Sequence, residues 1–202
     1  MSLRERKAAK KKEEILRSAL SLISEKGYYA TTMEDIAANL LMTKGSVYYY
    51  FKDKQDLVFQ SYLMLLEESS ERFEVIQQKN LPIIDKLRET MNSHISCLLS
   101  ERSGFELGLK PEQFFTDEQL KVVAEKREEY AGYFEKLIIE GKEAKIFQDV
   151  DVKIVRNIIL GAMNWLLQWY SPNGKLNSDE MADVVSNYLL RMLLESDDIV
   201  TK

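Results

Sequence analysis

Turn-forming residues are scarce in this sequence of 202 residues. Eight glycines and three prolines make up about 5% of the chain, against a usual share of about 12%. A β-sandwich or β-barrel needs a turn roughly every 8–12 residues, so this shortage argues against an all-β fold. The charged fraction of 30% and the apolar fraction of 45% are typical of a globular protein rather than a disordered one.

Cysteine and long apolar runs are also scarce. The one cysteine, Cys97, excludes a disulfide framework within the chain and suits a reducing compartment. The N-terminus has no apolar segment of the kind found in signal peptides. The longest apolar run, residues 154–170, is interrupted by four polar residues and is short for a membrane span. We therefore expect a cytoplasmic protein without membrane contact.

A single histidine leaves little material for acid–base catalysis. His94 and Cys97 lie three residues apart on one predicted helix face, which would allow two metal ligands, but two ligands do not complete a site. A glycine-rich phosphate loop after a predicted strand is missing as well. The sequence therefore predicts no enzyme, no metal site and no cofactor.

The net charge of −5 conceals an uneven distribution. Residues 1–54 hold eleven basic and seven acidic residues, whereas residues 55–202 hold 17 basic and 26 acidic residues. The two parts therefore carry net charges of +4 and −9. Such asymmetry indicates a nucleic-acid or membrane-surface partner for the basic part, or else a solvated basic helix face.

Helical periodicity and capping residues dominate the basic part. An amphipathic helix begins within the basic run and should end at Gly27 in a left-handed cap. A helix of about eight residues then begins at Thr31 or Thr32, each of which precedes an acid by three residues. After a tight connection at residues 41–42, Thr43 should cap a helix over residues 44–51.

The acidic part shows the same helical pattern. Asp53 should cap a helix that runs towards residue 79, and a further helix follows Pro82. We expect helices over residues 117–139, with Gly141 just beyond, and over residues 151–170, capped by Asp151. Ser178 should cap the last helix, and no segment reads convincingly as a strand. The fold class predicted from these patterns is all-α.

Residues 32–54 have the features of a helix-turn-helix that enters the major groove of DNA. No acid occurs from Thr43 to Lys52, as a helix facing the negative charge of DNA requires. Hydroxyl, glycine and lysine side chains at the start of the second helix suit phosphate and base contacts, while Val47 and Phe51 can face inward. The candidate DNA-contacting residues are Thr32, Thr43, Lys44, Gly45, Ser46, Tyr48, Tyr49, Tyr50 and Lys54.

Within this set, roles can be divided by chemistry. We expect Thr43, Tyr49 and Lys54 to bind phosphates. Base contacts are expected from Lys44, Gly45, Ser46 and Tyr50, whereas Tyr48 suits either the core or the DNA. The basic run of residues 4–12 reads equally as an arm that reaches phosphate or minor groove and as a solvated tail.

Residues 15–57 resemble the DNA-binding domain of the TetR (tetracycline-repressor) family of bacterial regulators. The matching residues are Ile15-Leu16, Ala19, Leu22-Ile23, Gly27, Thr32, Ile36-Ala37, Thr43–Tyr48, Phe51, Lys54 and Leu57. The chain departs from the family pattern at Leu41, where the turn usually has a glycine. A left-handed Leu41 would cost about 1–2 kcal/mol. The resemblance implies a cytoplasmic homodimer, usually a repressor, that binds a palindromic operator and is released by a small-molecule effector.

This resemblance divides the chain into a DNA-binding domain over residues 1–53 and a ligand-binding and dimerisation domain over residues 54–202. Residues 161–174 are similar to members that respond to fatty acyl-CoA; a drug-like lipophilic effector is the alternative, and a helical binding module that does not bind DNA is a third reading. Helices 151–170 and 178–195 are apolar over too much of their circumference for a monomer surface, which predicts pairing with a second copy. The candidate ligand-binding residues are Phe59, Leu63, Leu66, Met91, Ile95, Phe105, Phe115, Tyr133, Phe134, Ala162, Trp165 and Trp169.

Overall fold

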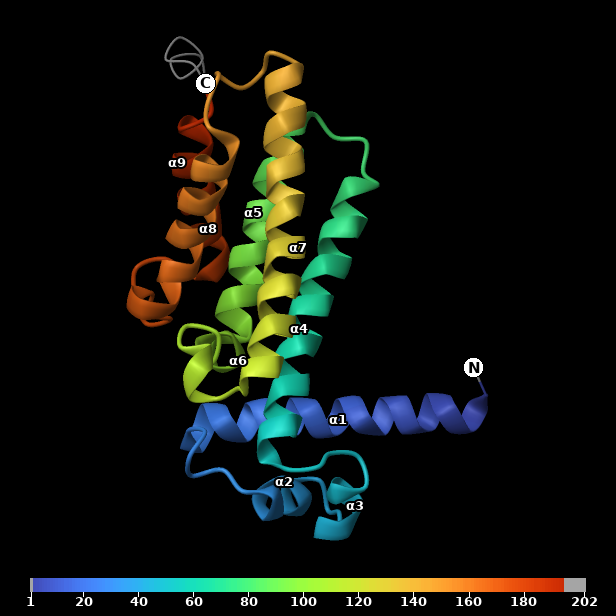
Figure 1. Cartoon of the computed structure of the whole chain (residues 1–202). Coiled ribbons are helices and arrows are strands. Elements are labelled where there is room, and N and C mark those ends of the chain that lie inside the picture. The colour runs from blue at the N-terminus through green and yellow to red at the C-terminus, as the bar shows by residue number, and fades with distance from the viewer. Residues whose placement is uncertain (1, 195–202) are drawn as a thin grey trace. The chain divides into compact units, whose positions relative to one another are not determined.

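The computed structural model describes residues 2–194, and this part of the chain is helical without a strand. The all-α fold is confirmed (Figure 1). The helices are α1 (Leu3–Lys26), α2 (Met33–Asn39), α3 (Lys44–Tyr48), α4 (Lys54–Gln77), α5 (Ile83–Ser100), α6 (Arg102–Glu106), the 3₁₀ helix η1 (Pro111–Gln113), α7 (Asp117–Glu143), α8 (Val152–Trp169) and α9 (Ser178–Arg191). Within residues 2–194, no helix is both long enough and apolar enough to cross a membrane.

The contacts between residues divide the chain into two compact units. The first unit consists of residues 1–65 and 101–124, and the second consists of residues 66–100 and 125–202. The first therefore contains α1, α2, α3, α6 and η1, while α5, α8 and α9 belong to the second. The predicted division of function after Asp53 stays a prediction.

Side-chain caps begin most of the helices where the sequence predicts them. Thr43 accepts a hydrogen bond from the backbone N–H of Ser46 at 3.2 Å. Asp53 accepts one from the N–H of Asp56 at 2.8 Å, and Asp151 accepts one from the N–H of Ile154 at 2.9 Å. These carboxylate and hydroxyl oxygens satisfy N–H groups that have no partner inside the helix.

Two predicted helix boundaries are wrong, and a third is right in position but not in conformation. The cap of α9 is Asn177 rather than Ser178, because the Asn177 amide oxygen accepts from the N–H groups of Asp179 and Glu180, both at 3.0 Å. The third helix stops at Tyr48 instead of residue 51. Gly27 ends α1 with a positive φ of 82°, but its ψ of 162° is extended rather than left-handed helical.

The end of α7 is a further correction, because the helix continues to Glu143 and includes Gly141. The chain reverses after α7 and returns Phe147 onto the helix, where its ring lies 2.0 Å from the position a Cβ atom on Gly141 would take. The N–H groups of Ile146 and Phe147 both donate to the Gly141 carbonyl. This glycine therefore provides a close approach for an aromatic ring rather than a helix stop.

A buried cation, Arg156 of α8, lies in the interior of the second unit. Its guanidinium donates to Glu128 at 2.9 Å and to Glu135 at 3.0 Å, both on α7. Only 4% of the Arg156 side chain is exposed. Removing the partners of a buried charge is costly, so this three-residue cluster holds α8 in a defined position against α7.

We predict that two glycine-to-alanine changes in α7 have opposite effects on stability. Gly141→Ala should lower the free energy of unfolding by about 1–3 kcal/mol, because the methyl group displaces the Phe147 ring. Gly132→Ala should raise it by about 0.5–1 kcal/mol, because nothing lies within 4 Å of the new Cβ atom and alanine favours helix. Urea unfolding of both variants measures the difference, and equal effects would contradict the packing role of Gly141.

Candidate DNA-binding surface

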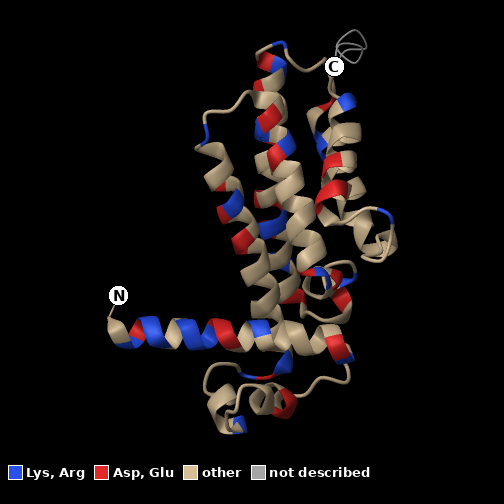
Figure 2. Cartoon of the chain, turned by 180° about the vertical axis from the view of Figure 1, so that it is seen from behind, with Lys and Arg blue, Asp and Glu red and all other residues tan. Residues whose placement is uncertain are grey.

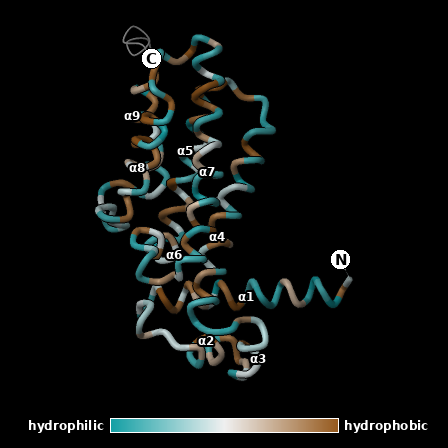
Figure 3. Tube along the Cα trace, in the orientation of Figure 1, coloured by the Kyte–Doolittle hydropathy of each residue, from teal (hydrophilic) through white to brown (hydrophobic). Residues whose placement is uncertain are grey.

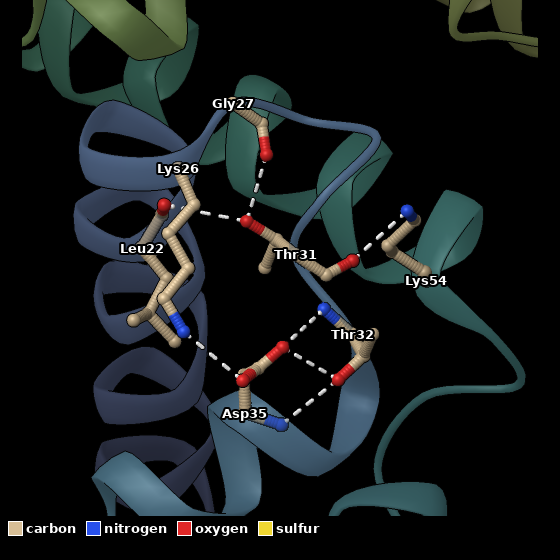
Figure 4. A network of polar contacts seen from close by, with 7 residues as sticks. All are labelled: Leu22, Lys26, Gly27, Thr31, Thr32, Asp35 and Lys54. Atoms are coloured by element: carbon tan, nitrogen blue, oxygen red, sulfur yellow. Dashed lines mark hydrogen bonds and ion pairs between the residues drawn. The ribbon is translucent and has the colours of Figure 1, made fainter.

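A polar network in the loop between α1 and α2 joins three helices of the first unit (Figure 4). Thr31 is fully buried, and its hydroxyl donates to the Gly27 carbonyl at 2.9 Å. The backbone carbonyl of the same residue accepts from the Lys54 ammonium of α4 at 2.9 Å. Thr31 therefore connects the end of α1 with the start of α4, and the loop residues cannot move independently of either helix.

Thr32, the next residue, begins α2 with a capping box. Its hydroxyl donates to the Asp35 carboxylate at 2.6 Å, its own N–H donates to the same carboxylate, and the N–H of Asp35 donates back to the hydroxyl. Of the two registers that the sequence allows, the structure uses Thr32 and Asp35. Thr32, a candidate DNA contact, thus has a structural role as well.

Asp35 also joins α2 to α1 through an ion pair with Lys26 at 3.0 Å. Hydrogen bonds from Thr32 and Lys26 lower the pKa of the Asp35 carboxyl group to about 2. A second connection between these helices is the hydrogen bond from the Asn39 amide to the Ser18 hydroxyl at 3.0 Å. Both ends of the seven-residue helix α2 are therefore tied to the longer α1.

The turn between α2 and α3 contains Leu41 in a left-handed conformation, with φ 53°. Its side chain is 97% exposed, so burial does not offset the cost of this conformation. The next residue is well anchored, because the Met42 N–H donates to the Ala37 carbonyl at 2.8 Å. The tight turn of the motif is thus formed without the usual glycine.

Helix α3 has one face in the core and one in solvent. Val47 and Phe51 are buried, as the sequence predicts. On the outer face the Tyr49 side chain is 78% exposed, Tyr48 is exposed and Tyr50 is partly buried with its ring edge against Tyr49. Gly45 has open space at its Cβ position apart from the Thr43 hydroxyl at 4.0 Å. The structure thus presents a small, open surface with hydroxyl groups at one end of α3.

Lys44 has a partner that sequence reasoning missed. Its ammonium pairs with the carboxylate of Glu34 on α2 and lies over the Tyr48 ring, 5.6 Å from the centroid. The hydrogen bond from Lys44 lowers the pKa of Glu34 and raises that of Lys44. The nine residues between Glu34 and Lys44 hide this pairing from local pattern analysis, because only the turn brings the two short helices together.

Lys54, a candidate phosphate contact, already has several partners inside the protein. Its ammonium donates to the carbonyls of Tyr28 and Thr31, both at 2.9 Å, and lies 4.4 Å from the centroid of the Tyr28 ring. Partial burial lowers its pKa. Two of its three N–H groups are used in this way, which leaves one for a phosphate.

The candidate ligand-binding residues fall into separate groups. In the first unit, Phe59 and Tyr62 contact Phe115, with ring centroids 5.7 Å and 5.6 Å apart, and Phe105 contacts Tyr62; Leu63 is half-buried there. In the second unit Leu66, Met91, Ile95 and Phe134 are buried, and the Tyr133 ring stacks on Phe73 at 4.1 Å. A ligand role for these residues stays a prediction.

The three candidates on α8 lie elsewhere, on its exposed face. Trp165 is 62% exposed and Trp169 is 52% exposed, and Ala162 is exposed beside them. The buried face of α8 is instead formed by Val155, Ile159, Met163, Leu166 and Leu167. Spacings of three and four residues place the tryptophans opposite this face, so they are surface residues of the single chain rather than part of its interior.

His94 and Cys97 have different partners instead of forming one site. The His94 Nε2 atom donates to the Asn164 amide oxygen, 3.1 Å away. Its Nδ1 atom therefore accepts from the Tyr130 hydroxyl at 3.0 Å. Burial lowers the pKa of His94 to about 4, which keeps the ring neutral near pH 7, and the Cys97 thiol contacts the Ser69 hydroxyl.

A groove of about 300 Å³ lies between α5 and α9 in the second unit. It is lined by Glu89, Asn92, Ser93, Ser96, Asp179, Ala182 and Asp183. Glu89 is paired with Lys79, so Asp179 and Asp183 give the groove its negative charge, which disfavours a phosphate-bearing ligand there.

Two family models match this chain. Residues 15–60 match the model of bacterial regulatory proteins of the tetR family. Residues 80–193 match the tetracyclin repressor-like C-terminal domain. The helix-turn-helix lies inside the first match, and the second match spans more than half of the chain.

Known proteins agree with these matches over nearly the full length. The fatty acid metabolism regulator protein of Bacillus subtilis strain 168 is 24% identical over 187 residues, 90% of this chain and 92% of that protein. A TetR/AcrR-family regulator from Thermobifida fusca YX-ER1 is 29% identical, with a TM-score of 0.76 over 90% of this chain and 97% of that one. AibR in complex with isovaleryl coenzyme A and operator DNA is 24% identical, with a TM-score of 0.73 over 91% and 97%.

The capped pair of short helices, the inward Val47 and Phe51 and the open face of α3 thus coincide with the segment that the tetR model matches. The chain belongs to the TetR family of bacterial transcriptional regulators, which bind DNA through this helix-turn-helix.

Proposed function

We propose that this protein is a repressor that binds a palindromic operator as a homodimer and leaves it when a small apolar or acyl-CoA effector binds. The observation that carries the DNA part is the surface of α3, where Thr43, Lys44, Ser46 and Tyr49 face outward and no acid occurs through Lys52. A helix with such a face can enter the major groove, because nothing on it repels phosphate.

The pairing of Lys44 with Glu34 gives this proposal a direct test. On operator DNA, the Lys44 ammonium exchanges a carboxylate for a base edge or a phosphate. Lys44→Ala should therefore weaken binding about 10–100-fold. Glu34→Gln should strengthen binding instead, because it releases Lys44 and removes a nearby negative charge. Gel-shift titrations with a palindrome from the DNA around its own gene measure both, and unchanged affinity in both variants would remove Lys44 from the interface.

An apolar face on α8 and α9 supports the homodimer. Its exposed members are Ile154, Ile158, Trp165, Trp169, Val184 and Tyr188. Exposed apolar side chains that recur at helical spacing on these two helices are typical of a protein–protein contact. Because a two-fold axis makes the same surface meet itself, pairing of α8 and α9 with their copies would place two α3 helices on two half-sites.

We expect a charge on this face to separate the dimer. Trp165→Glu should give a monomer at micromolar concentration, because a carboxylate buried in an apolar interface has no partner. Asn157→Glu introduces the same charge on the same helix about a quarter of a turn from the centre of this face, where the Asn157 side chain accepts from the Arg156 guanidinium, and it should remain dimeric. Light scattering with both variants gives the mass directly. A monomeric wild type would contradict the dimer, as would a dimeric Trp165→Glu.

The effector is proposed to bind in the second unit, with its apolar part among Met91, Ile95, Tyr133 and Phe134. These side chains come from α5 and α7 and are wholly or largely buried. A ligand can enter only if they move apart, which the flexible Met91 side chain favours. Support for an acyl-CoA comes from the names of the fatty acid regulator and of AibR with isovaleryl coenzyme A.

The proposed mechanism of release is a shift between two populations. Helix α4 begins at Lys54, which contacts the loop before α2, and continues to Gln77 in the second unit. Movement of α4 on ligand binding would therefore be transmitted to the DNA-binding helices. The ligand shifts the equilibrium only by as much as it prefers the form that does not bind DNA. We propose that the protein acts in the cytoplasm and has no catalytic role, in keeping with its relatives, which are named as regulators.

We predict that palmitoyl-CoA raises the melting temperature, since a ligand that binds only the folded state stabilises it by about 2.7 kcal/mol at 100 times its dissociation constant. Coenzyme A alone and palmitate alone are the controls that separate the two halves of the molecule. Met91→Trp, which fills the proposed acyl site, should remove the shift. The absence of a shift with wild-type protein at saturating palmitoyl-CoA would contradict the acyl-CoA assignment.

A further inference from the structure

The N-terminal half of α1 is a helical arm with one strongly basic stretch. Figure 2 shows basic residues along this half of the helix. Residues 3–14 contain six basic and three acidic residues, and most of their side chains are exposed. The sequence allows an arm that reaches phosphate or minor groove as well as a solvated tail, and it predicts a helix that begins within the basic run. The structure shows the whole run as part of α1, whose C-terminal half is buried in the first unit.

Local interactions explain why the arm is helical despite its exposure. Ser2 and Glu5 form a capping box at its first turn. Lys11 pairs with Glu14 and Arg17 pairs with Glu13, each at 3.0 Å. Because residues 15–23 already hold a helix through burial, the arm extends an existing helix and avoids the cost of nucleating a new one.

The basic residues of the arm are not evenly distributed around it. At about 100° per residue, Arg4, Lys7 and Lys11 fall within about 60° of one another, and Ser18 falls in the same arc. We call Arg4, Lys7 and Lys11 the basic stripe. Arg6 and Lys10 lie about a third of a turn away from its centre. Within the stripe, Lys11 is already paired with Glu14. Arg4 and Lys7 have no ion-pair partner among residues 2–194, so their charges are available to a ligand.

Ser18 shows which way the basic stripe faces. Its hydroxyl is hydrogen-bonded to Asn39 of α2 at 3.0 Å, so the stripe points to the same side of α1 as the helix-turn-helix. The Lys12 ammonium, about a third of a turn from the centre of the stripe on the side away from Lys10, lies 5.9 Å from the centroid of the Phe51 ring just after α3. In Figures 1 and 2, α2 and α3 lie on one side of α1, and the arm extends beyond α3.

We propose that the basic stripe binds the DNA backbone beside the half-site read by α3. The twelve residues of the arm span about 18 Å at 1.5 Å per residue, enough to follow about five base pairs of DNA. Arg4 and Lys7 contact phosphates outside the segment that α3 covers. Such contacts add affinity and position the protein but carry no base preference. The inference rests on the proposed operator binding.

The composition of the arm favours DNA over a membrane surface as the partner. An amphipathic helix that lies on a membrane needs a large apolar face opposite its charges. The arm offers Leu3, Ala8 and Ala9 as its apolar residues, and Figure 3 shows mainly hydrophilic positions along it. With no apolar face to insert, the arm suits a partner that binds by charge alone.

The test compares two double variants with equal charge changes. Arg4→Gln/Lys7→Gln removes two charges from the basic stripe, and Arg6→Gln/Lys10→Gln removes two from another face of the same helix. Binding to a palindrome with at least ten flanking base pairs on each side is measured from about 0.05 to 0.3 M salt. For each bound arm, the stripe variant should make the plot of log K against log salt about 1.8 units less steep, because two phosphate contacts are lost. At 0.15 M salt this corresponds to about 30-fold weaker binding. The control should change the slope by less than half as much.

Flanking DNA provides the second measurement. If the flanks are shortened to the edge of the half-sites, wild-type protein should lose about as much affinity as the two stripe substitutions remove on the long DNA. The stripe variant should bind the short and the long DNA almost equally. Equal slopes for both double variants would reduce the arm to diffuse charge and overturn the inference, as would unchanged slopes in both. Failure of the wild type to bind any palindrome would instead contradict the proposed function. Circular dichroism of both variants confirms that α1 remains helical.

Discussion

Two very short helices must keep a fixed geometry in this protein, and that constraint shapes the rest of the first unit. Helices of seven and five residues are not stable alone in water. Here the loop before α2 supplies the missing stability, because Thr31 bonds to α1 and α4 while Thr32 and Asp35 close the start of α2. Lys26 and Ser18 then fasten α2 to α1. DNA thus meets a preorganised surface rather than one that orders on binding.

Lys54 has a structural role beside the phosphate contact that we propose for it. Its ammonium satisfies two loop carbonyls and still has a third N–H for a phosphate. Leu41 shows the opposite arrangement, with an exposed side chain in a left-handed conformation that costs stability. The conformational preference of Leu41 is overridden because the turn between α2 and α3 requires a positive φ at this position.

In the second unit, α8 has a buried face and an exposed apolar face. One face carries Ile159 and Met163 into the core, and the buried Arg156 fixes the helix against Glu128 and Glu135 of α7. The opposite face leaves Trp165 and Trp169 exposed. The two tryptophans, which the sequence analysis assigns to a ligand site, thus lie where a second chain can cover them. The interior around Met91, Tyr133 and Phe134 remains, and it is the site that we propose for an apolar effector.

The sequence by itself determined the helical class, most helix starts and the helix-turn-helix, because caps such as Thr43, Asp53 and Asp151 and the spacing of Val47 and Phe51 act over only a few residues. Tertiary structure alone decided what depends on distant neighbours. Phe147 turned Gly141 from an expected stop into a packing site, and Glu34 became the partner of Lys44. The same holds for the face of α1 that carries Arg4 and Lys7, whose direction follows from the bond between Ser18 and Asn39. Periodicity shows which residues share a face, but only packing shows what that face meets.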